Sequence, residues 1–435
     1  MRKIVVILGA ILFSSGAYSA TLINDTEIES VVTEIVAPIA DAAGIARNRL
    51  NVFIVKDDDF NAFVMRGEDV YLYTGLLTKI RSPNALRAVV AHELGHVLGG
   101  HTAQMSAAVA AEIRRTMLIQ ALGVGLMVAG GNPSLGAGVM AGASGIARQS
   151  LLSFSRDEER MADDMGINLM VRAGFAPDGF LAVFEQMHEQ TAHLESKVNP
   201  NAMNHPLTAE RLKNVRDRLQ NLDIQDRTFV PDDKETLHKY ELVRAKLVGY
   251  LSDDTQIKAL YPYSNKSDAA IYARAIANMR RGNLSGAAVG IKTLLSRVPT
   301  NPFFFELLGD LEYAKGNYDS SIDAYVHALN LRPNSPQIET AQALALTARN
   351  KADDNTHAIE LCKSSILKSA TPMAYWILAR AYASDQGRAD WAMAEYYAMQ
   401  KLYTKAHENA RRAKTHLVVG SPEYIKADDI LKQKN

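Results

Sequence analysis

The chain has 435 residues, and its 48 basic and 48 acidic side chains give a formal net charge of zero. A general nucleic-acid binder needs a basic surplus, so we expect no nucleic-acid partner. The single cysteine, Cys362, excludes an internal disulfide framework and a zinc site built from cysteines alone. The length allows two or three domains, and the proportions of hydrophobic and charged residues are those of an ordinary globular protein.

The first twenty residues have the layout of a secretory signal peptide. Arg2 and Lys3 form a basic head, an apolar run covers residues 4–13, and mostly small residues follow up to Ala20. The apolar run is shorter than the roughly 20 residues that span a membrane. A signal anchor that stays in the membrane is the alternative, and the sequence leaves open whether cleavage follows Ser19 or Ala20. We expect an exported mature protein, which in a Gram-negative bacterium is located in the periplasm, either free or peripheral to a membrane.

Residues 21–250 are predicted to form one domain of helices with a small sheet. Ser82 and Pro83 have the residue types of an N-cap and a first helical position, so a helix that extends through residues 92–96 is expected to begin there. Residues 66–69 are typical of a hairpin turn between two of the strands. The segments with strand composition are residues 51–55, 62–65 and 70–74.

Two apolar, glycine-rich arms at residues 117–129 and 135–147 surround a short polar turn. Each arm is too short to span a membrane on its own. One interpretation is a buried helical hairpin or a mobile flap. The other is an element that contacts a membrane surface or covers the active site as a lid. The sequence leaves both interpretations open.

Beyond residue 268 the sequence repeats at an interval of 34 residues, which is the period of tetratricopeptide repeats. We therefore expect an α-solenoid over residues 269–435, joined to the first domain by a linker at residues 251–268. A generic helical solenoid is the alternative. The positions that recur are Gly282-Asn283 with Gly316-Asn317, Pro299 with Pro333, and Pro302 with Pro336.

Residues 92–96, His-Glu-Leu-Gly-His, have the pattern HExxH. Helix positions four apart lie on one face, so His92 and His96 can bind the same ion. Glu93 lies one step around the helix, where it can accept a proton from a water molecule that the metal activates. We interpret this pattern as a zinc site. Two core or surface histidines without a metal are the alternative.

A catalytic zinc ion needs three protein ligands and one open position. In one class of metallopeptidase the third ligand is a histidine six residues after the second, but Thr102 occupies that position here. His101 is one residue too early and is expected to point away from the ligand face. We expect it to form a structural hydrogen bond near the end of the helix.

A carboxylate on a second helix is the other source of a third ligand. Ser155 and Glu158 have the spacing of a capping box, which would occupy Glu158 with the helix end. Glu159 is therefore the better candidate ligand. Asp163, one turn later on the same face, is expected to accept a hydrogen bond from the second nitrogen of a zinc-binding imidazole. A solvated acidic helix start is the alternative.

Three motifs in combination resemble the gluzincin family of HtpX heat-shock peptidases and CAAX prenyl proteases, over roughly residues 25–225. They are residues 92–96, then Ser155-Arg156-x-x-Glu159-x-x-Ala162-Asp163, and then Asn204-His205-Pro206-Leu207-Thr208-x-x-Arg211. The signal peptide and the repeats make the chain most similar to the periplasmic branch of that family. One departure is Arg66-Gly67-Glu68, where the family usually has Pro-Gly-Gly.

The resemblance implies a mainly α protein, in which a gluzincin-type α+β metallopeptidase domain with a small sheet precedes an α-solenoid of tetratricopeptide repeats. It also implies a zinc-dependent endopeptidase with one zinc ion per chain and Glu93 as the general base. Arg211 would support the segment around His205. The implied zinc ligands are His92, His96 and Glu159.

The resemblance leaves three roles open for His205. It either approaches the metal and gates the site, or steadies the tetrahedral intermediate, or is a turn residue before Pro206. The repeats would present unfolded or misassembled outer-membrane proteins, or contact their assembly machinery. A competing hypothesis is a periplasmic chaperone or scaffold that uses the repeat groove with little proteolysis. Glu93 favours the enzyme, because a pure scaffold does not need this carboxylate.

Overall fold

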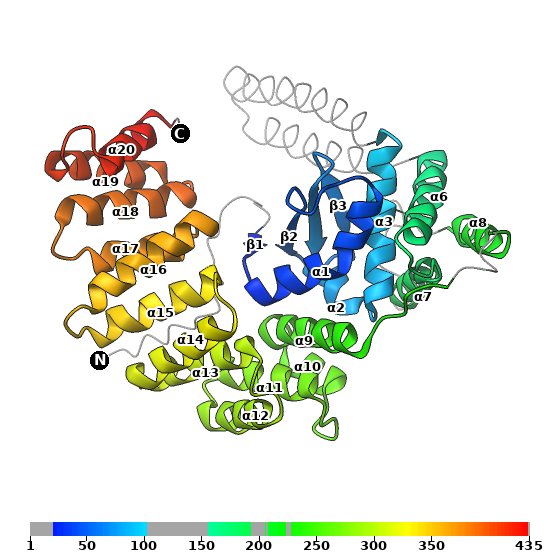
Figure 1. The fold of residues 1–435 in the computed structure, drawn as a ribbon, viewed down its shortest axis with the longest axis horizontal. Coiled ribbons are helices and arrows are strands. Elements are labelled where there is room, and N and C mark those ends of the chain that lie inside the picture. The colour runs from blue at the N-terminus through cyan, green and yellow to red at the C-terminus, as the bar shows by residue number, and fades with distance from the viewer. Residues whose placement is uncertain (1–20, 102–154, 193–204, 206–207, 223–227, 434–435) are drawn as a thin grey trace, which may run out of the picture. The chain divides into compact units, whose positions relative to one another are not determined.

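The computed structural model describes residues 21–101, 155–192, 205, 208–222 and 228–433 (Figure 1). They divide into two compact units, which we call the first unit (residues 21–24 and 28–243) and the repeat unit (residues 25–27 and 244–433). The signal peptide expected at residues 1–20 and the apolar arms within 117–147 lie outside the described residues. No helix in the described part of the chain is both long and apolar enough to cross a membrane.

The division between the units falls inside a continuous helix, α9 (Lys234–Leu251). The stretch expected to be a linker, residues 251–268, contains a further short helix, α10 (Asp254–Leu260). Asp253 and Gln256 form a capping box at its start. The domain bounds taken from the sequence, 21–250 and 269–435, therefore stay a prediction.

The first unit contains a four-stranded mixed sheet in the order β1-β2-β4-β3 within the described residues. β2 and β4 are parallel, and the other neighbouring pairs are antiparallel. The hairpin expected around residues 66–69 joins β3 and β4. Arg66 and Gly67 both have positive φ, 54° and 80°, as type I′ hairpin turns require. The strands are β1 (Thr21–Ile23), β2 (Asn51–Lys56), β3 (Ala62–Met65) and β4 (Asp69–Tyr73).

A buried helix, α3, lies between the sheet and two further helices of the first unit. It contacts β3 on one side and α6 and α7 on another (Figure 1). This position makes α3 the central element of the unit. The helices are α1 (Thr26–Ala42), α2 (Thr74–Lys79), α3 (Pro83–Leu98), α6 (Arg156–Arg172), α7 (Gly179–Ala192) and α8 (Ala209–Gln220).

The start of α3 agrees with the residue types that predicted it. The Ser82 side chain accepts a hydrogen bond from the backbone N–H of Ala85, and Pro83 is the first helical residue. Arg87 is buried, pairs with Asp232 and donates to the carbonyl oxygen of Ile35 at 3.0 Å. A buried arginine with satisfied partners fixes the helix in place, because losing a partner would leave an uncompensated charge.

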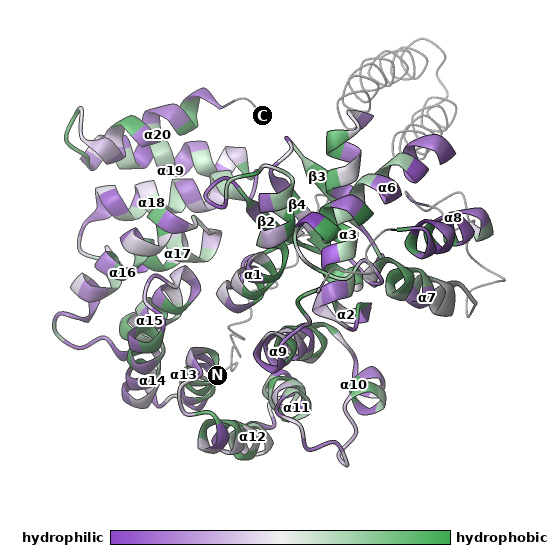
Figure 2. Cartoon of the chain, turned by 45° about the vertical axis from the view of Figure 1, so that its right-hand side comes forward, coloured by the Kyte–Doolittle hydropathy of each residue, from purple (hydrophilic) through white to green (hydrophobic). Residues whose placement is uncertain are grey.

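The repeat unit is a succession of helix pairs. The first helices of three successive pairs, α11, α13 and α15, begin at residues 268, 302 and 336, which is the 34-residue interval of the sequence. Hydrophilic and hydrophobic residues are intermixed along the helices of the repeat unit (Figure 2), as expected for helices that bury one face. The helices are α11 (Asp268–Arg280), α12 (Leu284–Arg297), α13 (Pro302–Lys315), α14 (Tyr318–Leu331), α15 (Pro336–Arg349), α16 (Asp354–Lys368), α17 (Pro372–Ala381), α18 (Gln386–Met399), α19 (Tyr403–His416) and α20 (Pro422–Lys432).

Candidate metal centre

Two imidazoles of α3 converge on one point. The Nε2 atoms of His92 and His96 lie 3.1 Å apart, and both side chains are buried. Between them, Gly95 faces α6: a Cβ atom at this position would lie 2.5 Å from the carbonyl oxygen of Ala162. The glycine of the HExxH pattern therefore allows α6 to approach α3 closely enough to bring a carboxylate to the two imidazoles.

That carboxylate belongs to Glu159. Its oxygens lie 3.5 Å from the Nε2 atoms of both His92 and His96, and the residue is 1% exposed. Glu158 is instead part of the capping box, since its Oε2 accepts a hydrogen bond from the backbone N–H of Ser155 at 2.8 Å. The structure thus has Glu158 in the capping box and Glu159 beside the two imidazoles, as the spacing predicts.

His205 completes the group. Its Nδ1 atom lies 2.7 Å from Oε1 of Glu159 and 3.3 Å from Nε2 of His92. One potential ligand atom from each of His92, His96, Glu159 and His205 lies within 4.8 Å of all the others. With zinc–nitrogen bonds of about 2.0–2.1 Å, tetrahedral ligand atoms lie about 3.3 Å apart. The distances and the nitrogen and oxygen donors therefore fit a zinc ion.

A second layer of charged groups surrounds these four side chains. Oδ1 of Asp163 lies 2.9 Å from Nδ1 of His92, the nitrogen that faces away from the cluster. Arg211, on α8, donates to both oxygens of Asp163, at 2.9 and 2.8 Å, and lies 2.5 Å from Oε2 of Glu159. Such partners fix the orientation of the side chains that bind a metal. The contact between Arg211 and Glu159 has no signal in the sequence.

Burial and neighbouring charges shift the titration of the site in different directions. Burial raises the pKa of Glu93 above its usual range. Burial also lowers the pKa of His96 to about 3, so this ring is neutral and can offer a lone pair. Burial alone would raise the pKa of Glu159, but the imidazoles around this carboxylate outweigh burial and hold the pKa low. The ring of His96 and the carboxylate of Glu159 thus have the protonation states that metal ligands need.

Glu93 lies at the edge of the cluster. Its Oε1 atom is 3.5 Å from Nε2 of His205, and it does not contribute to the four-residue group. His101 lies on the opposite side of His96, with the Nδ1 atoms of the two rings 3.0 Å apart. The sequence predicted a hydrogen bond for His101 near the helix end, but not that its partner is one of the candidate ligands.

Comparison with known proteins places these residues in a family. The model of Peptidase family M48 matches residues 24–219, and the Cytochrome c-type biogenesis protein H TPR domain matches residues 268–410. Metalloprotease YcaL of Escherichia coli (strain K12) is 30% identical over 188 residues, which cover 42% of this chain and 68% of that protein. This chain belongs to peptidase family M48. The expected order of a metallopeptidase domain followed by tetratricopeptide repeats is confirmed.

Longer relatives match both parts of the chain. The Beta-barrel assembly-enhancing protease of Escherichia coli (strain K12) is 27% identical over 325 residues, which cover 73% of this chain and 64% of that protein. The protein of the same name from Yersinia pestis is 24% identical over 423 residues, which cover 94% of this chain and 84% of that protein. The match thus spans a little under two thirds of the Escherichia coli relative.

Proposed function

We propose that this chain is a zinc-dependent endopeptidase that degrades unfolded or misassembled proteins of the bacterial envelope. The convergence of His92, His96 and Glu159 beside Glu93 carries the proposal. The metalloprotease relatives and the name Beta-barrel assembly-enhancing protease support it. The signal peptide pattern of residues 1–20 supports a periplasmic location.

The candidate ligands and Glu93 have different roles in peptide hydrolysis. A zinc ion held by His92, His96 and Glu159 would act as a Lewis acid that polarises the scissile carbonyl and lowers the pKa of a water molecule. Glu93 accepts a proton from the attacking water and delivers it to the leaving amine. Burial raises the pKa of Glu93 toward the operating pH, which favours a group that must first accept and then release a proton.

A substrate in extended conformation has a strand to pair with near this helix. Among the described residues β3 is an edge strand of the sheet, and α3 contacts it. An edge strand offers unpaired backbone groups to an extended peptide, which binds as an added strand. Backbone pairing is independent of side-chain identity, as the degradation of many unfolded proteins requires.

His205 is positioned to restrain this activity. Its Nδ1 atom is a fourth potential ligand, and a fourth protein ligand would occupy the open position that hydrolysis needs. A low resting activity would reconcile the peptidase with a chaperone or scaffold role of the repeats. The stabilisation of a transition state by His205 is the competing role, and the two predict opposite effects of its removal.

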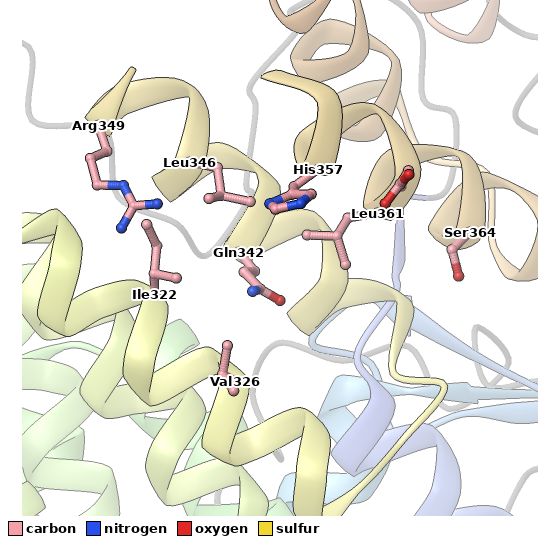
Figure 3. A pocket seen from close by; sticks show the side chains of 9 residues that line it. Ile322, Val326, Gln342, Leu346, Arg349, His357, Leu361 and Ser364 are labelled. Carbon is pink, nitrogen blue, oxygen red and sulfur yellow. The ribbon is translucent and has the colours of Figure 1, made fainter. Parts of the chain in front are cut away.

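The repeats offer a place where a client chain can bind. A cavity of about 490 Å³ lies between α14, α15 and α16, with apolar side chains flanked by polar ones (Figure 3). An unfolded segment with mixed apolar and polar side chains suits such a lining. The lining residues are Ile322, Val326, Gln342, Leu346, Arg349, His357, Glu360, Leu361 and Ser364.

The Glu93→Gln variant tests the proposed function. The amide is nearly isosteric but cannot accept the proton, so zinc should stay bound while cleavage of an unfolded test protein falls by about 10²-fold or more. Glu210→Gln, at an exposed position on α8, is the matched control and should cleave as the unaltered protein does. Undiminished cleavage by Glu93→Gln would remove Glu93 from the mechanism.

A further inference from the structure

The end of α3 folds back onto the candidate metal centre. The helix ends at Leu98, and Gly100 has a φ of 74°, a left-handed conformation that suits glycine. His101 follows this turn and is 2% exposed. A Cβ atom on Gly99 would lie 2.6 Å from Nε2 of His101, so only glycine leaves room for the ring. The Gly99-Gly100 pair thus creates the space that His101 fills.

The ring of His101 meets the outer nitrogen of His96. Nε2 of His96 faces the cluster, 3.1 Å from Nε2 of His92, and its Nδ1 lies 3.0 Å from Nδ1 of His101. A ring that offers a lone pair on Nε2 carries its proton on Nδ1. That proton is then donated to His101, which must accept on Nδ1 and carry its own proton on Nε2.

We infer that His101 is a positioning residue, which holds His96 in the tautomer and orientation that zinc binding needs. The inference rests on the proposed zinc site and extends it to a residue outside the ligand set. Ligand histidines generally donate their second N–H to a carboxylate, a carbonyl oxygen or water, and the loss of such an acceptor costs about 10- to 100-fold in metal affinity. Here the acceptor is a neutral imidazole.

A neutral acceptor suits the charge of this site. Glu93, Glu159 and Asp163 are three buried carboxylates, and Arg211 together with a divalent ion supplies three positive charges. His92 already has a carboxylate acceptor in Asp163, at 2.9 Å. A second carboxylate behind His96 would add a buried charge without a partner, which is costly. His101 orients the second ligand without that cost.

Zinc affinity of the full chain, measured by competition with a chelator, tests the inference. His101→Leu removes the acceptor and should weaken zinc binding about 10- to 100-fold. His101→Asn keeps an acceptor oxygen near the Nδ1 position and should recover most of the affinity. Gly99→Ala should resemble His101→Leu by displacing the ring. Gly100→Asn is the control and should bind zinc normally, because asparagine tolerates this φ and a Cβ there meets nothing within 4 Å.

Nitrogen-15 NMR of the histidine rings in the unaltered, zinc-loaded chain gives a second readout, which does not depend on whether His101→Leu folds. The spectrum should show His101 protonated on Nε2 and His96 protonated on Nδ1, with His101→Asn used for assignment. A His101 ring protonated on Nδ1, or equal zinc affinities for the leucine and asparagine variants, would overturn the inference. An unaltered chain that binds no zinc would instead contradict the proposed function itself.

Discussion

Adjacent glutamates at the start of α6 have different environments. Glu158 is part of the capping box, and the backbone hydrogen bond from Ser155 lowers its pKa. Glu159, one residue later, is buried against the two imidazoles of α3. A rotation of α6 by one residue would exchange these environments. The two glutamates therefore indicate which face of α6 is turned toward the candidate metal centre.

We expect Glu159→Gln to weaken zinc binding much more than Glu158→Gln. The first variant removes an anionic ligand, whereas glutamine at the third helical position still supports a capping box. The two zinc affinities can be compared by chelator competition, and we predict a ratio of at least about 10. The reverse order would mean that Glu158 is the ligand.

The His205→Ala variant separates the roles that remain open for His205. If the ring occupies the open position of the metal at rest, its removal should raise basal peptidase activity severalfold. If the ring stabilises the transition state, the same variant should lower turnover while zinc stays bound. A peptidase assay with zinc analysis distinguishes these outcomes, and an unchanged rate would support a turn residue. We expect the basal peptidase activity to rise, because a potential ligand atom of His205 lies within 4.8 Å of those of His92, His96 and Glu159.

Features of the site that depend on the spacing of residues within one helix could be predicted from the sequence. Contacts across a turn or between helices could not. The HExxH spacing and the capping box pointed to His92, His96 and Glu159, which the structure brings together. The partner of His101 depends on the backbone path at Gly99 and Gly100. The contact between Arg211 and Glu159 depends on where α8 packs, which no local pattern specifies.

At the scale of elements, the close packing of α3 and α6 is what assembles the candidate metal centre. Small residues at two positions along these helices allow the close packing: Gly95 lies against Ala162, and Gly166 lies against Ala91. A Cβ on Gly95 would clash with backbone atoms of α6, whereas a Cβ on Gly166 would first meet the tip of the Phe180 ring. The separation of the two helices therefore depends most directly on Gly95.

We predict that Gly95→Ala pushes α6 away and weakens both the fold and the zinc site. Overpacking of this kind costs about 1–3 kcal/mol of stability. The free energy of unfolding and the zinc affinity should both fall. Gly290→Ala, in α12 of the repeat unit, is the control for overpacking outside the candidate metal centre. Its Cβ would approach Ala275 at 3.0 Å and Ile271 at 3.5 Å, and the zinc affinity should stay unchanged. Zinc affinity that is unchanged in Gly95→Ala would show that the site tolerates a wider helix separation.

Several elements of the first unit were predictable because their signals are local. The hairpin of β3 and β4 and the start of α3 follow from turn and capping residues. The helix α10, which lies within the expected linker, was not predicted, although Asp253 and Gln256 carry a capping signal. Its seven residues are too few to show a hydrophobic periodicity, which is the main sequence signal for a helix.

At the scale of the whole molecule, a buried charge cluster ties the end of α9 into the repeat unit. Lys246 lies 2.8 Å from Asp25, 3.1 Å from Glu27 and 3.3 Å from Glu306. The hydroxyl of Tyr272 donates to Glu27 at 2.8 Å. Burial raises the pKa of Glu306 to about 8. The cluster joins segments that are far apart in the sequence.

This cluster makes the fragment 21–250 a sensitive test of domain organisation. The fragment contains every candidate zinc ligand, so we expect it to bind zinc. It keeps Lys246 with Asp25 and Glu27 but loses the contacts from Glu306 and Tyr272, and the loss of partners from a buried charge cluster destabilises a fold. Thermal unfolding should therefore begin at a lower temperature than in the fragment 21–315, which restores both partners. Equal unfolding temperatures would show that the cluster contributes little to stability.

The zinc content of the purified full chain tests the central claim most directly. Elemental analysis should find one zinc ion per chain that survives dialysis and is retained in Glu93→Gln. His92→Ala and His96→Ala should each lose it on dialysis, because each variant removes one of the two imidazoles of α3 and weakens the hold of the remaining ligands on the ion. A chain purified without zinc, or equal metal content in the two histidine variants and the unaltered protein, would contradict the account.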